Sequence, residues 1–481
     1  MVQLWVYWIK RVHKIGLIKV MSLISKSCSL YTAALLLVTT TVTAVEKETV
    51  TEVVLSNGLK VLVKEDHRAP VVVSQIWYKV GASYEVEGIT GLSHMLEHMM
   101  FKGTEKHGPN EFSEIISVNG GRENAFTGAD YTAYFQRLEK SRLEISMELE
   151  SDRMRNLTLP EEEFIKEREV VQEERRMRTD DKPTSLTYEQ FMATAFQTSP
   201  YHNPVIGWMN DIENYTVADM RSWYEKWYAP NNATLVIAGD VDPVAVIEMA
   251  KKYYGPLQRS DLVPPKPRVE IEQLGPREVV VKVPAKLPYL IMGFPTPSVV
   301  TAEEEWEPYA LEVMAYILDG GDSSRLGKHL VRGTEIAASA GAGYDLYDRL
   351  QTLFLVDGVP SDGHTVAEIK SALLQELKEL KINLVTKREL DIVKAKVVAD
   401  KVFEQDSVFY QAMQMGELET VGLSWREADR YAELVRKVTA EQVMAVANKY
   451  IILDRVTTAI LDPLPLESSK PAPSSEGDSN E

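Results

Sequence analysis

The segment Thr216–Ala238 reads TVADMRSWYEKWYAPNNATLVIA, and Thr439–Leu461 reads TAEQVMAVANKYIILDRVTTAIL. Each combines a helical pattern with a β-rich run. The offset between the two segments is 223 residues, both from Thr216 to Thr439 and from Thr234 to Thr457. Self-similarity over so long a period predicts a duplicated domain.

The residues before Thr216 supply the rest of one copy. The β-rich runs are 52–63, 71–80 and 233–238, and the helical patterns between them are 91–101, 111–118, 141–155, 160–178 and 217–227. Strands first, helices next and a final strand predict an α+β fold rather than a doubly wound sheet. We therefore predict two homologous domains, each an antiparallel-rich sheet packed with helices.

The predicted boundaries follow from composition. The two domains are expected at 45–258 and 277–463, joined by the linker 259–276, which contains the Pro-rich run 264–267. The tail 464–481 is rich in Pro, Ser and acidic residues and is predicted to be disordered.

Composition excludes several classes of protein. Of 481 residues, 53 are basic and 71 acidic, and the net charge of −18 argues against a nucleic-acid-binding protein. The single cysteine, Cys28, excludes a disulfide framework and any multi-cysteine metal cluster. A metal ion would have to be held by His and carboxylate side chains.

The N-terminal 44 residues are typical of an export signal. Residues 1–28 carry basic but no acidic side chains, an apolar run follows from Leu30 to Val38, and Val42-Thr-Ala44 fits a cleavage site. The apolar run is too short for a stable membrane span. We predict export with cleavage after Ala44; the alternatives are an uncleaved anchor or a start at Met21.

One pentapeptide carries the chemistry. His94-Met-Leu-Glu97-His98 lies on a predicted helix, where residues four apart share a face, so both imidazoles can bind one zinc ion. Glu97 would sit over a bound water, whose pKa zinc lowers to about 7, and would act first as base and then as acid. The alternative is a structural cluster without a metal.

A third ligand is expected from the acidic helix 160–178. Glu167 and Glu174 are seven residues apart and share one face of that helix. Spacing alone does not choose between Glu169, Glu173 and Glu174. A solvated charged helix without any ligand is the alternative.

Three segments together resemble a known family. They are His94–Thr104 (HMLEHMMFKGT), Gly120–Thr127 (GGRENAFT) and Glu169–Met177 (EVVQEERRM). They are similar to the inverted-zincin metallopeptidases, which include pitrilysin, insulin-degrading enzyme and the mitochondrial processing peptidase. The resemblance extends from about Val50 to Pro463 and is closest to bacterial exported members of half length.

The resemblance implies roles for individual residues. The spacing in the family assigns the third zinc ligand to Glu174, beside His94 and His98, and assigns Glu167 a supporting role in catalysis. Asn124 and Ala125 match an edge strand to which the backbone of an extended peptide adds. Each chain would hold one Zn²⁺.

The second half departs from the catalytic pattern. Its corresponding helix, Leu311–Asp319, has no His-x-x-Glu-His, so this copy is expected to be inert. Family enzymes also use an Arg and a Tyr from an inert half. Arg332 could serve, but the tyrosine expected near Ala338 is missing, and Tyr344 and Tyr347 lie nearby but off the pattern. The resemblance therefore implies a zinc-free homologous partner subunit that supplies both, unless Tyr344 substitutes or a homodimer suffices.

Together these observations predict an exported zinc endopeptidase of the bacterial periplasm. The resemblance further implies that it forms half of a clamshell and, as the catalytic subunit of a heterodimer, hydrolyses short or unfolded peptides in an enclosed chamber. A non-catalytic, chaperone-like subunit and a zinc-storage protein are the alternatives. The intact Glu97 argues against the first, and the lack of further His and acidic clusters argues against the second.

Overall fold

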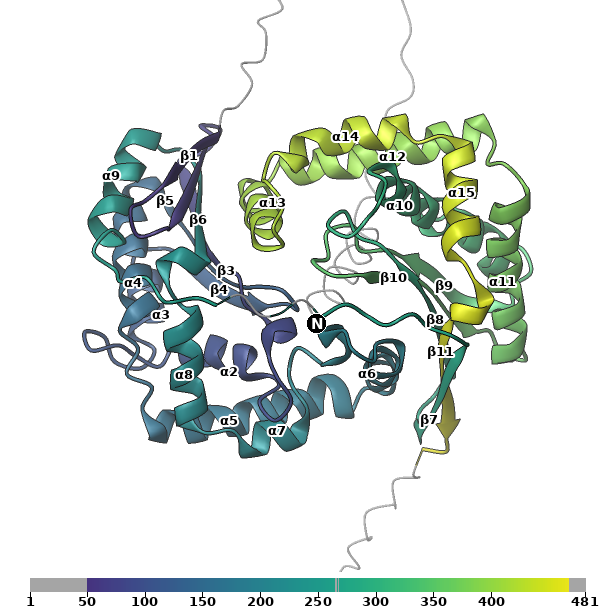
Figure 1. The fold of residues 1–481 in the computed structure, drawn as a ribbon, viewed down its shortest axis with the longest axis horizontal. Helices are drawn as coiled ribbons and strands as arrows, with labels where there is room; N and C mark the ends of the chain where they lie inside the picture. The colour runs from purple at the N-terminus through teal and green to yellow at the C-terminus, as the bar shows by residue number, and fades with distance from the viewer. Residues whose placement is uncertain (1–49, 264–265, 267, 467–481) are drawn as a thin grey trace, which may run out of the picture.

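The protein consists of two halves that each build a sheet with helices on its outer side (Figure 1). A computed structural model describes residues 50–263, 266 and 268–466. The predicted signal segment, three prolines of the predicted linker and the tail from residue 467 lie outside the described residues. We call residues 50–263 the first half and residues 268–466 the second half.

The first sheet has the strand order β1-β2-β6-β3-β5-β4. The strands are β1 Val50–Val54, β2 Lys60–Glu65, β3 Val71–Tyr78, β4 Arg122–Thr127, β5 Thr132–Glu139 and β6 Ala233–Gly239. All neighbours are antiparallel except β2 and β6. In the centre, Ile76 of β3 pairs with Tyr134 of β5 and Leu235 of β6, and all three are buried. Strand β4 forms one edge.

The second sheet repeats this plan with the order β7-β11-β8-β10-β9. Its strands are β7 Arg277–Pro284, β8 Tyr289–Thr296, β9 Ala337–Gly343, β10 Thr352–Pro360 and β11 Thr457–Leu464. Only β7 and β11 run parallel. Because β11 inserts between β7 and β8 as β6 inserts between β2 and β3, the predicted α+β duplication is confirmed.

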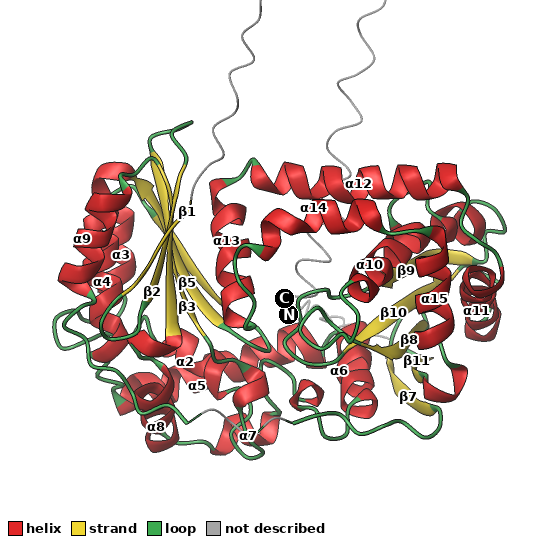
Figure 2. Cartoon of the chain, turned by 45° about the horizontal axis from the view of Figure 1, so that its top comes forward, coloured by secondary structure: helices red, strands yellow, loops and turns green. Residues whose placement is uncertain are grey.

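Helices cover the outer face of each sheet, except α6 and α13, which pack against the sheet of the other half (Figures 1 and 2). In the first half they are α2 Leu92–Met99, α3 Glu111–Val118, α4 Leu143–Arg155, α5 Glu161–Arg175, α6 Pro183–Ala195, α7 Met209–Asn214, α8 Val217–Trp227 and α9 Pro243–Tyr253. In the second half they are α10 Trp306–Asp319, α11 Val366–Ile382, α12 Lys387–Gln405, α13 Val408–Thr420, α14 Glu427–Lys437 and α15 Ala440–Tyr450. The helix predicted over 160–178 is α-helical only to Arg175 and continues as a π-helical turn, Arg176–Asp180.

The repeated segments fold in the same way for the same local reason. Helix α8 begins with a capping box between Thr216 and Asp219, and α15 begins with one between Thr439 and Gln442. Each box satisfies backbone N–H groups that a helix start leaves without partners. Both helices then return the chain to the centre of a sheet.

The two halves exchange one helix each. Helix α13 of the second half packs on the inner face of the first sheet, where Ala412 and Met415 join a cluster with Trp77. Helix α6 of the first half packs on the second sheet, where Phe191 joins a cluster with Ile291. Each sheet therefore depends on the other half for the burial of its inner face.

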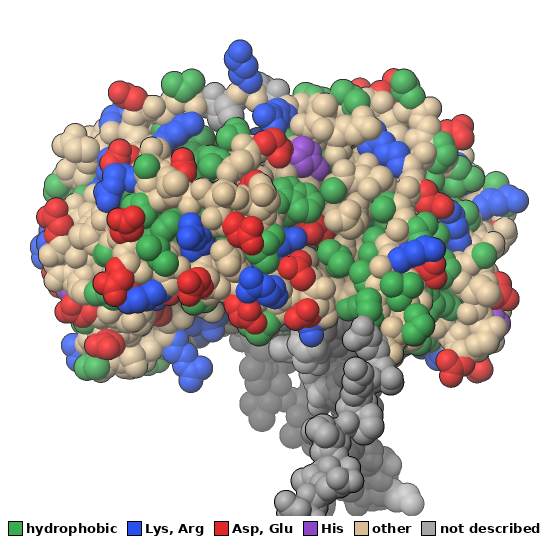
Figure 3. Space-filling model, turned by 90° about the horizontal axis from the view of Figure 1, so that it is seen from below, with side chains coloured by type: hydrophobic (Ala, Val, Ile, Leu, Met, Phe, Trp, Pro, Cys, Tyr) green, Lys and Arg blue, Asp and Glu red, His purple; other side chains and the backbone are tan. Residues whose placement is uncertain are grey.

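The surface carries mixed charge. On the face seen in Figure 3, acidic and basic side chains are interspersed, without a broad basic patch. Within the described ranges, no helix is long and apolar enough to cross a membrane.

Candidate functional site

A tightly packed loop presents helix α2. Gly91, directly before the helix, has φ of +84°, and Gly207 has φ of +89°. A Cβ at Gly91 would lie 2.3 Å from the Ile206 carbonyl oxygen, and one at Gly207 would lie 2.3 Å from the Thr90 oxygen. Only glycine fits at this close approach, which fixes where the helix starts.

Two buried carboxylates hold the N-terminus of α2. Glu85 accepts hydrogen bonds from the backbone N–H groups of Gly91 and Ser93, both at 2.7 Å. Asp211 accepts from the Thr90 N–H at 3.1 Å and from the Thr90 hydroxyl at 2.6 Å. Burial raises the pKa of Glu85 to about 7, although the two N–H groups act in the opposite direction. These contacts set the position of the two histidines on the helix.

The predicted metal ligands come together. One ligand atom each from His94, His98 and Glu174 lies within 4.8 Å of the others. Glu174 Oε2 is 3.4 Å from His98 Nε2 and 3.9 Å from His94 Nε2, and Glu174 Oε1 is paired with Arg178. Glu169 and Glu173, the alternatives left open by spacing, are exposed.

The donor set fits zinc. Ligand atoms that bind Zn²⁺ tetrahedrally at about 2.0–2.1 Å are roughly 3.3 Å apart. The separation of 3.4 Å between Glu174 and His98 matches this value, and the separation of 3.9 Å between Glu174 and His94 is somewhat longer. His94 is buried, and its Nε2 atom is the one that faces Glu174; its other ring nitrogen, Nδ1, has no hydrogen-bond partner in the described part of the chain. Burial lowers the pKa of His94 to about 3, which keeps the imidazole in the neutral form that binds metals.

Glu167 orients the second histidine. Its Oε2 atom is 3.1 Å from His98 Nδ1, and its Oε1 atom is 2.5 Å from Lys102 Nζ. Burial opposes a charge on His98, but its hydrogen bonds with Glu167 and Glu174 outweigh burial and raise the pKa to about 9. A metal ion that binds His98 at neutral pH therefore has to displace a proton. A carboxylate on the outer nitrogen of a histidine is the usual way to aim the other nitrogen at a metal.

Glu97 lies on the same helix and is held by one hydroxyl. The Thr127 Oγ1 donates to Glu97 Oε2 at 2.5 Å. Burial raises the pKa of Glu97, and the bond from Thr127 acts in the opposite direction. A carboxylate with a raised pKa beside a candidate metal site is suited to proton transfer.

The remaining predicted residues lie outside this cluster. Asn124 and Ala125 are on the edge strand β4, and the Asn124 side chain accepts a hydrogen bond from the Ala125 N–H at 2.9 Å. Arg332 is exposed at the end of the π-helical turn Gly327–Val331, and no ion pair joins it to the cluster among the residues described. The Tyr344 hydroxyl donates to the Pro297 carbonyl at 2.5 Å.

Several supporting residues are not predictable from the motifs. Thr127 belongs to the segment Gly120–Thr127 but has no role implied there, and no sequence pattern indicates a role for Glu85, Asp211 or Lys102. Lys102 lies beyond the end of α2 at Met99, so helical spacing does not place it beside Glu167. The contacts of Glu85 and Asp211 depend on a loop conformation that no periodicity reveals.

Comparisons with known proteins identify the family. The family model described as "Insulinase (Peptidase family M16)" matches residues 60–208, and the one described as "Peptidase M16 inactive domain" matches residues 214–397. The "Zinc protease PqqE" of Helicobacter pylori is 33% identical over 427 residues, covering 85% of this chain and 92% of that protein. The chain belongs to peptidase family M16. The resemblance inferred from three sequence segments is confirmed.

Further relatives agree with the M16 assignment. An "Uncharacterized zinc protease" of Rickettsia bellii is 26% identical over 414 residues, covering 85% of this chain and 96% of that protein. The crystal structure of a protease from Helicobacter pylori matches with a TM-score of 0.82 at 31% identity, covering 86% of this chain and all of that chain. The periplasmic protease PqqL from Escherichia coli shares the fold, with a TM-score of 0.73 at 19% identity over 86% of this chain and 47% of that chain. This M16 chain is thus related to metalloproteases.

Proposed function

We propose that the chain is a zinc-dependent endopeptidase. The observation that carries the proposal is that ligand atoms of His94, His98 and Glu174 lie within 4.8 Å of one another. Glu97 lies on α2, the helix of the two histidines. The names of the M16 relatives, which are zinc proteases, support the choice of metal.

Each residue of the candidate site has a separate role. His94, His98 and Glu174 would hold one Zn²⁺, which when bound supplies Lewis acidity for the hydrolysis of a peptide bond. Glu97 accepts a proton from the attacking water and delivers it to the leaving amine. Thr127 holds the Glu97 carboxylate, and Glu167 holds the His98 ring. The free edge of β4 at Asn124 and Ala125 is suited to pairing with an extended peptide.

We further propose a zinc-free homologous partner that supplies an arginine and a tyrosine. Arg332 is exposed rather than placed at the cluster, and the Tyr344 hydroxyl is already bonded to Pro297. The match to this chain covers 47% of the PqqL chain, so PqqL is about twice as long. Two units of this size would enclose short or unfolded peptides, in keeping with export to the periplasm.

The test is cleavage of a quenched fluorescent peptide library by the zinc-loaded chain. We expect cleavage that a chelator abolishes and that Glu97→Gln reduces by a factor of about 10³ or more while zinc content is unchanged. Equal rates for the wild type and Glu97→Gln would contradict the assigned base. The alternative, a non-catalytic subunit, predicts no chelator-sensitive cleavage with or without partner.

The partner is tested separately. If a zinc-free homologue is required, the isolated chain should hold zinc and cleave slowly, and adding the homologue should raise kcat. A fully active isolated chain would contradict the heterodimer.

A further inference from the structure

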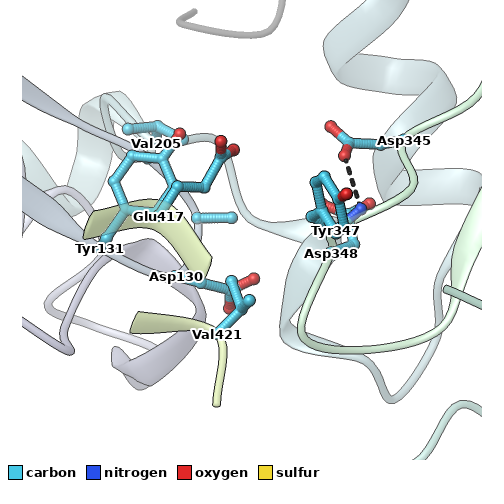
Figure 4. A pocket seen from close by; sticks show the side chains of 10 residues that line it. Asp130, Tyr131, Val205, Asp345, Tyr347, Asp348, Glu417 and Val421 are labelled. Carbon is cyan, nitrogen blue, oxygen red and sulfur yellow. Dashed lines mark hydrogen bonds between the residues drawn. The ribbon is translucent and has the colours of Figure 1, made fainter. Parts of the chain in front are cut away.

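A short turn lies between the candidate site and the second half. Residues Gly128–Tyr131 connect β4 to β5, directly after Thr127, whose hydroxyl binds Glu97. Figure 4 shows Asp130 and Tyr131 of this turn across a pocket from Asp345 and Tyr347 of the second half. We call residues 128–131 the site turn.

The first half holds the site turn through backbone contacts. The Ala82 N–H donates to the Gly128 oxygen at 3.2 Å, and the Ser83 N–H donates to the Ala129 oxygen at 2.7 Å. A Cβ at Gly81 would lie 2.4 Å from the Gly128 oxygen, so the two segments are in close contact.

The second half holds the site turn through one arginine. Arg349 Nε donates to Asp130 Oδ1 at 2.9 Å, the Arg349 backbone N–H donates to Asp130 Oδ2 at 3.2 Å, and Arg349 Nη2 donates to Ser83 Oγ at 2.7 Å. The guanidinium carbon lies 4.4 Å from the centroid of the Tyr84 ring. Ser83 Oγ in turn donates to Asp130 Oδ1 at 2.6 Å, and Tyr201 OH also binds Asp130.

We propose that Arg349, on the inert half, is a positioning residue for Glu97, acting through Asp130 and the site turn on Thr127. The inference rests on the proposed function, since Glu97 must be the base for its position to affect turnover. It gives the inert half a role at the catalytic site of its own chain, besides any role of a partner subunit.

The physical reason is that Asp130 is buried. Asp130 is 3% exposed, and Ser83, which donates a hydrogen bond to it, is 7% exposed. Without Arg349 the carboxylate would keep only neutral donors in a site that water reaches poorly, so the site turn would rearrange to solvate it. The Thr127 hydroxyl, three residues away, would then no longer hold Glu97 in one orientation.

The experiment compares Arg349→Met with Arg426→Met in the full zinc-loaded chain. Arg426 also joins the halves, through an ion pair of 2.8 Å with Glu52 of β1, but at the opposite edge of the sheet from β4. We expect Arg349→Met to lower kcat by about 10- to 100-fold, with KM within about twofold and zinc content unchanged. We expect faster hydrogen exchange at residues 128–132 in Arg349→Met only. Arg349→Lys, which keeps the charge, should recover part of kcat.

A double variant separates positioning from a general structural role. In a Thr127→Val background, Arg349→Met should cause no further loss of kcat, because the coupling passes through the missing hydroxyl. Equal losses in both backgrounds, or wild-type kcat in Arg349→Met, would overturn the proposal.

Failure of the proposed function has a different signature. A wild-type chain that cleaves nothing, alone or with a partner, refutes the peptidase, whereas the exchange measurement still decides the mechanical link. Unchanged exchange at residues 128–132 in Arg349→Met overturns that link whatever the activity.

Discussion

At position 174 a buried carboxylate faces two imidazoles, whereas its neighbour Glu173 is exposed and pairs with Arg176 at 3.1 Å. We predict that Glu174→Gln weakens zinc binding by at least about 100-fold, since even residues outside the ligand shell are worth roughly 10- to 100-fold. Glu173→Gln is the matched control and should bind zinc as the wild type does. Competition with a chromophoric chelator measures both, and equal affinities would place the third ligand elsewhere.

Glu85 makes stability depend on pH. Its pKa rises on folding from 4.5 to about 7, mainly because it is buried. A group with a raised folded pKa stabilises the fold below the unfolded pKa, and this contribution is lost as the pH rises through about 7. The contribution is at most about 3 kcal/mol. The zinc-free wild type should therefore lose stability between about pH 4.5 and 7 at this residue.

The variant Glu85→Gln tests this. Glutamine accepts at one oxygen only, so one backbone N–H of α2 loses its partner at a cost of about 1–3 kcal/mol near pH 5. The difference from the wild type should shrink near pH 9, because only the wild type titrates. Guanidinium denaturation at pH 5 and pH 9 measures the difference in unfolding free energy between the variant and the wild type. Glu87→Gln, at an exposed side chain, is the control. A difference that grows with pH would contradict the assigned sign.

Helical spacing alone predicts only part of the candidate site. His94, Glu97 and His98 follow from the i, i+4 geometry of one helix. The choice of Glu174 over its neighbours needed a family resemblance, because three glutamates of α5 satisfy similar spacing. Thr127 reaches Glu97 through a sheet edge, a contact between distant segments that spacing does not encode.

At the scale of elements, the repeat was predictable and the helix exchange was not. The 223-residue offset and the matching helix and strand patterns are properties of local sequence. The apolar face of α13, however, is like that of any amphipathic helix, and nothing in its periodicity says that it covers the sheet of the other half. Which surface a helix covers is decided by tertiary packing.

The contact of α13 with the first sheet gives a prediction. A Cβ at Gly416 would lie 2.2 Å from Nε1 of the buried Trp77. Gly416→Ala should gain about 1 kcal/mol of helix propensity but lose more through overpacking, which typically costs about 1–3 kcal/mol. We expect a net loss in denaturation experiments. Gly275→Ala, with no atom within 4 Å of the added carbon, is the control; a Gly416→Ala chain of raised stability would mean that α13 is not docked on Trp77.

At the scale of the whole molecule, the exchange of α6 and α13 should make the two halves unfold together. Each half has a large hydrophobic cluster of its own, but the inner face of each sheet loses its cover if the other half unfolds. Because the two halves share the packing of their sheets, we do not expect them to move apart to admit a substrate. Opening of a chamber would then occur between subunits rather than within this chain.

Phe191 tests that cooperativity. It belongs to α6 of the first half, is fully buried, and lies so close to β8 that a Cβ at Gly293 would be 2.5 Å from its ring. Phe191→Ala should cost about 3–5 kcal/mol, whereas Phe403→Ala, at a residue that is 71% exposed, should cost less than about 0.5 kcal/mol. Because the clusters interlock, far-UV circular dichroism and zinc release should follow one shifted transition. A Phe191→Ala chain in which the second half melts first while the first half keeps its zinc would show that the halves are independent.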